Sequence, residues 1–174
     1  RRHAERHGLP LLQIEDGFLR SVGLGDRDPP LSIVVDDRGI YYDATTASRL
    51  ESLIAGAQHD AALQRSRALQ QLWRDARLSK YNHAREIAPP LRGDYALVID
   101  QTFGDASIGY GLADANRFRD MLQAALDEHS GLPVLLKVHP DVIAGRKRGH
   151  FEGLSAGAAS RVTVLASEAH APAL

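Results

Sequence analysis

The second half of the chain alternates short apolar runs with a longer stretch in which apolar residues recur every three or four positions. Residues 96–99, 134–138 and 162–165 have the length and composition of buried strands. Between the first two, residues 114–129 carry one apolar face and predict a helix, formed by Phe118, Met121, Leu122, Ala125 and Leu126. The order strand, helix, strand predicts a parallel α/β sheet with right-handed crossovers.

The first half has shorter and less regular elements. Its pattern predicts a helix over residues 1–7, a strand over 11–14, a hairpin made by 32–35 and 40–42, a helix ending near Gly56, and a helix over 60–78. Asp43, Thr45 and Thr46 are candidate N-caps for the helix that ends near Gly56. The last helix has an apolar stripe, which predicts that Trp73 packs in a core and is not a ligand platform.

A linker separates these two halves. Pro89, Pro90 and Gly93 interrupt the periodic pattern, as is typical of a connection between domains. We therefore expect one domain over residues 1–88 and a second over 93–174. Because the chain starts within an expected helix and stops just after an apolar strand, both domains are expected to be incomplete.

Composition narrows the class of protein. The 174 residues are 44% hydrophobic and 25% charged, which is ordinary for a globular protein with a core. A net charge of -1 gives no overall attraction to nucleic acid, so a nucleic-acid partner is not expected. The absence of cysteine excludes disulfides, thiolate nucleophiles and cysteine-bound zinc. With neither a membrane-spanning run nor the apolar stretch of a signal peptide, the sequence favours a cytoplasmic location.

Chemically versatile side chains follow three separate apolar strands. Glu15 and Asp16 follow the first, the acids between Asp100 and Asp105 follow the second, and His139 to Asp141 follows the third. Each group alone has an ordinary structural explanation: a solvated turn, a loop cap or a buried histidine. Ligands of open α/β sheets bind outside the carboxyl ends of strands, so the coincidence of three such endings predicts a cleft with chemistry in it.

Several motifs in one order make the chain recognisable. The segments EDGFLRSVGLG, PLSIVVDDRGIYYDAT, LSKYN, VIDQTFGDASI and KVHPD resemble the capsule polysaccharide biosynthesis family of retaining β-Kdo glycosyltransferases. The resemblance extends over nearly the whole chain. It implies the glycosyltransferase B fold, two Rossmann-like domains facing across a cleft. It also implies transfer of Kdo, an acidic eight-carbon sugar, from CMP-β-Kdo. In capsule assembly the products are short β-Kdo linkers on a lysophosphatidylglycerol acceptor.

The resemblance also implies roles for individual residues. His139 and Pro140 match the family's His-Pro motif, whose histidine contacts the CMP phosphate and assists its departure. Asp105 matches the expected nucleophile of a double displacement, which would retain the β configuration. Glu15, Asp16 and Gly17 match an acceptor-side motif, and whether Glu15 or Asp16 is the base stays open. The expected substrate-binding residues are Gly17, Arg20, Lys80, Gln101, Ser107 and Pro140, although Arg20 and Lys80 are equally consistent with ordinary surface charges.

The resemblance implies no metal and no cofactor, because a histidine-assisted cytidylate leaving group does not require one. Expected partners are CMP-Kdo, a phospholipid or Kdo-oligosaccharide acceptor, and a capsule biosynthesis or export complex at the inner membrane. Three alternatives stay open. The donor is CMP-sialic acid or another nucleotide sugar, the protein is a phosphoesterase or hydrolase that binds a metal through Asp16, Asp105, His139 and Asp141, or the chain is a non-catalytic capsule-assembly module.

Overall fold

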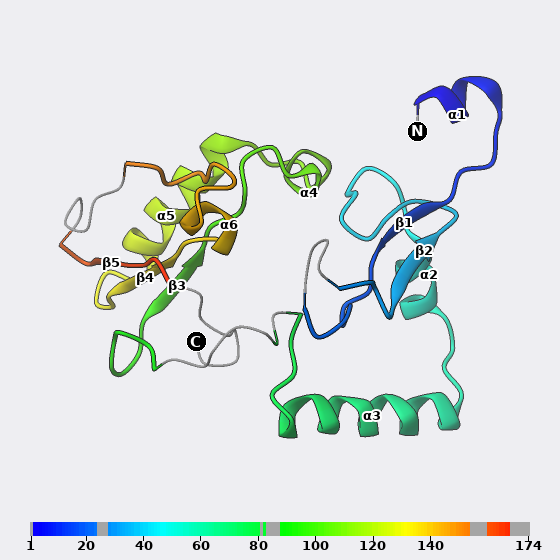
Figure 1. Ribbon diagram of the computed structural model, residues 1–174, viewed down its shortest axis with the longest axis horizontal. Coiled ribbons are helices and arrows are strands. Elements are labelled where there is room, and N and C mark those ends of the chain that lie inside the picture. Colours follow the sequence, from blue (N-terminus) through cyan, green and yellow to red (C-terminus); the bar gives the residue numbers. More distant parts are fainter. Residues whose placement is uncertain (1, 24–27, 81, 83–87, 154–159, 168–174) are drawn as a thin grey trace. The chain divides into compact units, whose positions relative to one another are not determined.

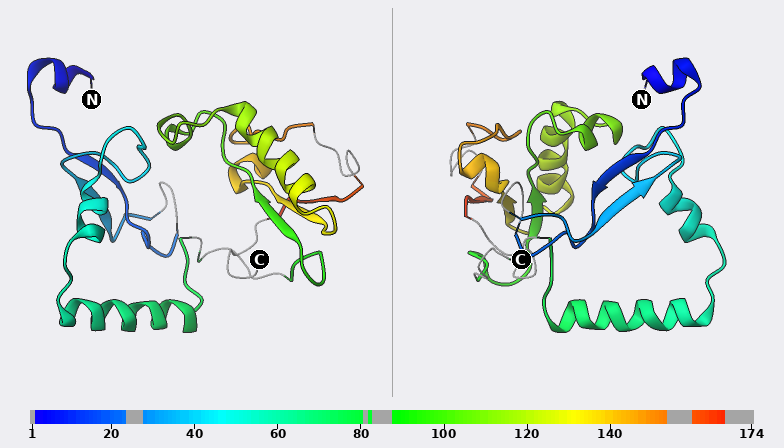
Figure 2. Two further views of the ribbon diagram at one scale, coloured as in Figure 1. Left: turned by 180° about the vertical axis from the view of Figure 1, so that it is seen from behind. Right: turned by 45° about the vertical axis from the view of Figure 1, so that its right-hand side comes forward.

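The computed structural model describes residues 2–23, 28–80, 82, 88–153 and 160–167. The chain divides into two compact units, with the division between residues 86 and 87 (Figures 1 and 2). Each unit has its own sheet, and each is described below by itself.

The second unit is built on a parallel sheet of three strands. The strands are β3 (Ala96–Ile99), β4 (Val134–Lys137) and β5 (Val162–Leu165), and their order in the sheet is β3-β4-β5. Helix α5 (Ala115–Glu128) connects β3 to β4 and begins after the N-cap Asp114. The three strands, the helix and the parallel α/β class predicted from the sequence are therefore confirmed.

The core of this unit lies between the sheet and α5. All four residues of the central strand β4 are buried. Val98, Val134 and Leu136 from the sheet pack in one cluster with Phe118 and Leu122 of α5. Full burial of such a side chain contributes about 1.5 to 3 kcal/mol, so this cluster is the main source of the unit's stability.

Two short helices, which the sequence pattern did not predict, follow the carboxyl ends of β3 and β4. Helix α4 (Ala106–Tyr110) has Asp105 as its N-cap, and α6 (Pro140–Ile143) has His139 as its N-cap. Helices of four or five residues are too short to show a periodic apolar face. Their positions nevertheless determine how the candidate catalytic side chains are held.

The first unit contains an antiparallel pair of strands. Strand β1 (Gln13–Asp16) pairs with β2 (Ile33–Asp36), so that Gln13 lies opposite Asp36 and Asp16 opposite Ile33. The predicted hairpin between 32–35 and 40–42 is therefore wrong. The β1 strand also lies two residues later than predicted, so that Glu15 and Asp16 belong to the strand itself.

Asp36 explains why the chain does not return as a second hairpin strand. Its Oδ1 accepts hydrogen bonds from the backbone N–H groups of Arg38 (2.9 Å) and Gly39 (3.0 Å), while Oδ2 accepts one from Arg49 (2.7 Å). These bonds fold residues 36–39 into a turn and tie it to the start of the next helix. Ile40 is then buried at 1% exposure outside any strand.

Three helices accompany this strand pair: α1 (Arg2–His7), α2 (Arg49–Ala55) and α3 (Asp60–Asp75). The α2 cap is Ser48, which forms a capping box with Glu51, so the prediction of Asp43, Thr45 or Thr46 as the cap is wrong. Asp43 instead accepts hydrogen bonds from Thr45. None of the helices that the structure describes is long and apolar enough to cross a membrane.

Helix α3 differs from its prediction in packing. It is amphipathic, but none of its residues is buried, and Leu69 and Leu72 are half or more exposed. The predicted core position of Trp73 is therefore wrong, since its side chain is only partly covered. Periodicity identifies the apolar face of a helix, whereas burial requires an element that packs against that face.

Replacing Asp36 with Asn is expected to destabilise the first unit by roughly 1 to 3 kcal/mol, because the amide turns a donor toward a buried N–H group. Burial raises the pKa of Asp36, but the bonds from Gly39, Arg38 and Arg49 outweigh it and hold the pKa below 3.8. Its stabilisation is therefore present above pH 3.8 and lost as pH falls through the lower folded value. Urea unfolding at pH 7 and at falling pH measures both effects.

Asp37→Asn is the matched control, because Asp37 is an exposed neighbour that pairs with Arg49 at the surface. We expect this variant to change the free energy of unfolding much less. Equal destabilisation by both substitutions would contradict the role assigned to the buried carboxylate.

Candidate active site

The carboxyl ends of β3 and β4 bring two of the predicted catalytic residues to one edge of the sheet. The strands are paired in register up to Ile99 and Lys137, and the N–H of Asp100 donates to the Lys137 carbonyl at 2.9 Å. The chain then continues into Asp105 on one side and His139 on the other. The two are close enough for His139 to influence the pKa of Asp105.

Asp105 presents a carboxylate that is held at one oxygen. As the N-cap of α4, it accepts hydrogen bonds at Oδ1 from the Ser107 N–H (2.9 Å) and the Ser107 hydroxyl (2.7 Å). Its other oxygen, Oδ2, has no hydrogen-bond donor among the described residues. Partial burial raises the pKa of Asp105, but the two Ser107 bonds, Lys147 and His139 outweigh it and lower the pKa below 3.8. The carboxylate is therefore ionised at neutral pH.

His139 is held in a similar way but is neutral. Its Nδ1 accepts a hydrogen bond from the Asp141 N–H at 3.1 Å, which assigns the proton of the neutral ring to Nε2. Burial is the main cause that lowers the pKa of His139 below 6.5, and Lys147 and Lys137 lower it further against the opposing effect of Asp141. At neutral pH the ring therefore offers an N–H donor at Nε2 without carrying a charge.

Asp100 supports the loop that leads to Asp105. Its side chain is 2% exposed and accepts hydrogen bonds at Oδ1 from the backbone N–H groups of Gln101 (2.9 Å) and His150 (3.1 Å). Burial raises its pKa above 3.8 in spite of these bonds. A Cβ atom at position 149 would lie 2.3 Å from Oδ2, so Gly149 leaves the space that the carboxylate occupies.

The loop that meets Asp100 is also packed against the core of the second unit. The His150 ring stacks on Phe118, with ring centres 3.8 Å apart and planes 5° from parallel. A Cβ at Gly149 would lie 3.2 and 3.3 Å from the Cγ atoms of Val142, so the space around the carboxylate is filled on that side as well. Because Phe118 belongs to the core cluster, the loop that carries His150 and binds Asp100 packs directly on the core of the second unit.

In the first unit, the acidic motif lies at the end of β1. Adjacent residues of a strand point to opposite faces, which places Glu15 and Asp16 on different sides of β1. Asp16 accepts a hydrogen bond from Arg20 Nε at 2.8 Å, whereas Glu15 has no side-chain hydrogen bond within the described ranges. Gly17 is required sterically, because a Cβ there would lie 2.9 Å from the backbone carbon of Ser32.

The other predicted binding residues differ in their burial and in the elements that carry them. Arg20 is 7% exposed and its guanidinium also donates to the Ser21 hydroxyl (3.1 Å) and the Asp28 carbonyl (2.6 Å). Lys80 lies in a turn after α3 in the first unit and is partly buried. Gln101 is exposed beside Asp100, and Pro140 is the first residue of α6. The binding roles of these residues, and that of Ser107, stay predictions.

The structure thus forms two groups, one in each unit. Asp105, Ser107, His139, Pro140 and Gln101 follow the carboxyl ends of β3 and β4 in the second unit. In the first unit, Glu15 and Asp16 end β1, and Arg20 is bound to Asp16. Across the described part of the chain, no three His, Asp or Glu side chains gather so as to hold a metal ion.

Sequence reasoning missed Lys147, although its charge acts on Asp105, His139 and Asp141. The available signal was the run Arg146-Lys147-Arg148, three successive cations in a loop otherwise rich in small residues.

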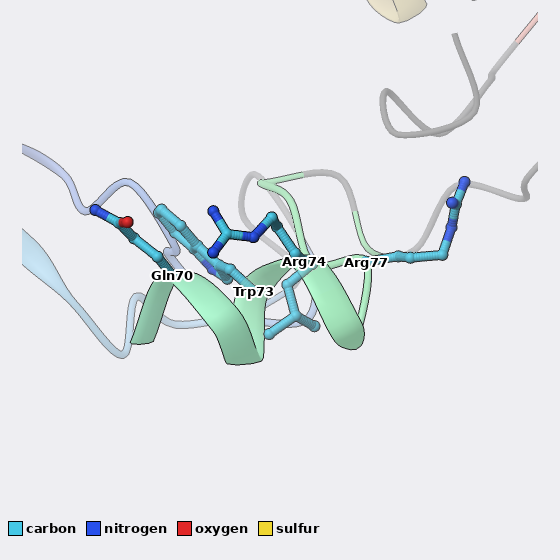
Figure 3. Close-up of a pocket in the computed structure, with 5 residues that line it drawn as sticks. Gln70, Trp73, Arg74 and Arg77 are labelled. Atoms are coloured by element: carbon cyan, nitrogen blue, oxygen red, sulfur yellow. The ribbon is translucent and has the colours of Figure 1, made fainter. Parts of the chain in front are cut away.

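A hollow of about 390 Å³ lies elsewhere, along the end of α3 (Figure 3). It is lined by Gln70, Trp73, Arg74, Arg77 and Leu78. The indole N–H of Trp73 is buried and has no hydrogen-bond partner within the described residues. None of the predicted site residues lines this hollow.

Similar solved structures are two transferases from Thermosulfurimonas dismutans. The structure of "KpsC, beta Kdo 2,4 transferase" is 42% identical with a TM-score of 0.86 and aligns with 97% of this chain and 54% of its own. The structure of "KpsC, beta Kdo 2,7 transferase" is 28% identical with a TM-score of 0.56, over 79% of this chain and 45% of its own. The described fold is therefore that of part of a KpsC structure.

Similar sequences include a capsule polysaccharide modification protein and a lipopolysaccharide-processing protein. The capsule polysaccharide modification protein LipA of Neisseria meningitidis serogroup A is 46% identical over 163 residues, 88% of this chain and 23% of LipA. The lipopolysaccharide-processing protein LpsZ of Rhizobium meliloti is 37% identical over 154 residues, 84% of this chain and 35% of LpsZ. The chain thus spans about a quarter to a third of the length of these relatives.

The family model for capsule polysaccharide biosynthesis proteins matches residues 1–65 and 55–174, which together include the whole chain. The motifs on which the resemblance was based lie within these matches. The chain belongs to the capsule polysaccharide biosynthesis protein family.

Proposed function

We propose that the protein containing this chain is a glycosyltransferase that transfers Kdo from CMP-β-Kdo to a phospholipid or Kdo acceptor with retention of configuration. The observation that carries the proposal is that an ionised Asp105 and a neutral, Nε2-protonated His139 follow the carboxyl ends of the neighbouring strands β3 and β4. Similarity to the KpsC transferases supports the choice of Kdo as the transferred sugar.

In the first displacement, Asp105 Oδ2 attacks the anomeric carbon and forms a glycosyl ester. The bond from that carbon to the phosphate oxygen of CMP breaks, and its electron pair leaves with the phosphate. His139 Nε2–H donates a hydrogen bond to the departing phosphate, whose oxygens need no full proton transfer. An ionised carboxylate beside an uncharged donor suits this step, because the donor does not neutralise the nucleophile.

In the second displacement, the acceptor hydroxyl attacks the same carbon and releases Asp105. Its proton passes to a carboxylate of the acceptor side. We assign this role to Glu15, because Asp16 is already bound by the buried Arg20 and the two acids lie on opposite faces of β1. Two inversions in succession return the β configuration.

The remaining features of the proposal concern the whole protein. The two units would belong to the two Rossmann-like domains of a glycosyltransferase B fold, with the acceptor side in residues 1–88 and the nucleotide-sugar side in 93–174. The greater similarity to the 2,4 transferase than to the 2,7 transferase favours a 2,4 linkage. Activity would need neither metal nor cofactor, at a site on the cytoplasmic face of the inner membrane and in contact with a capsule biosynthesis or export complex.

Incubation with CMP-β-Kdo is expected to add the mass of one Kdo unit to the peptide that contains Asp105. The Asp105→Asn variant should show no adduct and lose transfer activity by at least about 1,000-fold, because an amide is a poor nucleophile. Intact and peptide mass spectrometry of the longest natural polypeptide containing these residues measures the adduct, and chromatography of the product measures transfer. Asp114→Asn, a change at the exposed N-cap of α5, is the matched control and should form the adduct normally.

An adduct on another residue, or full transfer activity in Asp105→Asn, would contradict the assignment. Thermal stabilisation of the polypeptide by an added divalent metal would favour the phosphoesterase or hydrolase class instead.

Loss of the ionised nucleophile with falling pH is expected only below pH 3.8, because the lowered pKa keeps Asp105 ionised above that value. In the rate of adduct formation at saturating donor, this acidic limb is separate from the change that protonation of His139 causes at a pH below 6.5. Ser107→Ala removes the hydroxyl that lowers this pKa, so the acidic limb should move to higher pH. Rapid-quench mass spectrometry across pH measures the pH at which this rate falls. Ser107→Thr keeps a hydroxyl, so its rate should fall at nearly the same pH as that of the wild type. Identical pH profiles for all three proteins would show that the Ser107 hydroxyl does not lower the pKa of Asp105.

A further inference from the structure

The three successive cations Arg146, Lys147 and Arg148 form a basic segment (residues 146–148) after the Gly145 turn. The segment is fixed by the backbone on both sides. The N–H groups of Arg146 (2.8 Å) and Lys147 (3.1 Å) donate to the Asp141 carbonyl, near His139.

On the other side, the Phe103 N–H donates to the Arg148 carbonyl at 2.8 Å, within the loop that leads to Asp105. Two residues beyond the segment, the His150 N–H is bound by the buried carboxylate of Asp100 at 3.1 Å. The basic segment is therefore hydrogen-bonded on one side to α6, which His139 caps, and on the other side to the loop that leads from β3 to Asp105.

The two arginines of the segment already have partners within the chain. Arg146 donates twice to Asp141 Oδ1, at 2.9 and 2.7 Å. Arg148 pairs with Glu152 at 3.3 Å, and its guanidinium lies 5.2 Å from the centre of the Phe103 ring. Neither arginine is free to turn toward a ligand without breaking these contacts.

Lys147 is different. Its side chain is exposed, and its ammonium group has neither a hydrogen bond nor an ion pair with any residue in the described ranges. Its charge nevertheless reaches both Asp105 and His139. Of the three cations, the one without a partner among the described residues is therefore the one whose charge acts on both candidate catalytic side chains.

We propose that Lys147 is an anion-binding residue of this site and contacts an anionic oxygen of the donor, either on the nucleotide phosphate or on the sugar carboxylate. This inference rests on the proposed function. A donor with two anionic groups approaches the ionised carboxylate of Asp105, and the neutral His139 supplies no charge against that repulsion. Lys147 supplies the missing positive charge as a flexible point charge on a backbone fixed from both sides.

The test uses the longest natural polypeptide that contains these residues and the variants Lys147→Met, Lys147→Arg and Arg148→Met. Lys147→Met removes the charge but keeps most of the apolar stem, and Arg148→Met is the matched control one residue away. Calorimetry measures the affinity for CMP alone and for Kdo alone. Rapid-quench mass spectrometry measures the rate of adduct formation against the concentration of CMP-β-Kdo.

We expect Lys147→Met to weaken binding of one of the two probes by about 10- to 100-fold, as for loss of one charge-assisted hydrogen bond. Weaker CMP binding assigns the contact to the phosphate, and weaker Kdo binding assigns it to the carboxylate. The affected affinity should also depend less steeply on salt, a change that damage to the fold would not produce. Lys147→Arg should restore most of the affinity, and Arg148→Met should stay within a few-fold of wild type.

Unchanged affinity of Lys147→Met for both probes would overturn the inference, as would equal losses in Lys147→Met and Arg148→Met. The inference would also be wrong if the wild-type protein bound neither probe. Failure of the proposed function has a different signature, because wild-type protein would then bind CMP or Kdo in a Lys147-dependent way without forming an adduct on Asp105.

Discussion

The buried carboxylate of Asp100 is the interaction on which the candidate site depends. It joins the end of β3 to a loop 50 residues later, through the N–H of His150. The same loop carries Lys147, and its Arg148 carbonyl accepts the Phe103 N–H. Burial disfavours the charged form of Asp100, and its two backbone hydrogen bonds offset part of that cost. The carboxylate is thus tolerated because the neighbouring backbone requires an acceptor there.

The sequence predicted the second unit well and the first unit less well, for a physical reason. In the second unit each strand is a compact apolar run, and β4 is buried throughout, so local composition and final environment agree. In the first unit, the register of β1 is set by pairing with β2, so that exposed Leu12 lies outside the strand and Glu15 lies within it. Strand pairing is a tertiary property that a local apolar pattern does not contain.

For the candidate site, sequence reasoning found residues that follow strands and missed the contacts between distant segments. Asp105 and His139 were predicted because each comes shortly after an apolar run and matches a motif. The bridge from Asp100 to His150 and the position of Lys147 depend on how the loop after α6 folds back. A run of three cations shows that charge is present. Only the contacts of Arg146 and Arg148 show that Lys147 is the cation without a partner in the described part of the chain.

The two candidate catalytic side chains share one structural device, which explains how they can be both fixed and reactive. Each is the N-cap of a short helix and uses one atom, Asp105 Oδ1 or His139 Nδ1, as acceptor for a backbone N–H two residues ahead. That bond orients the side chain and leaves its second atom, Oδ2 or Nε2, for a ligand. For Asp105, the Ser107 bonds outweigh burial and favour the ionised form, whereas for His139 burial is the main cause that favours the neutral form. The caps therefore orient both side chains, but only for the aspartate does the cap also determine the charge.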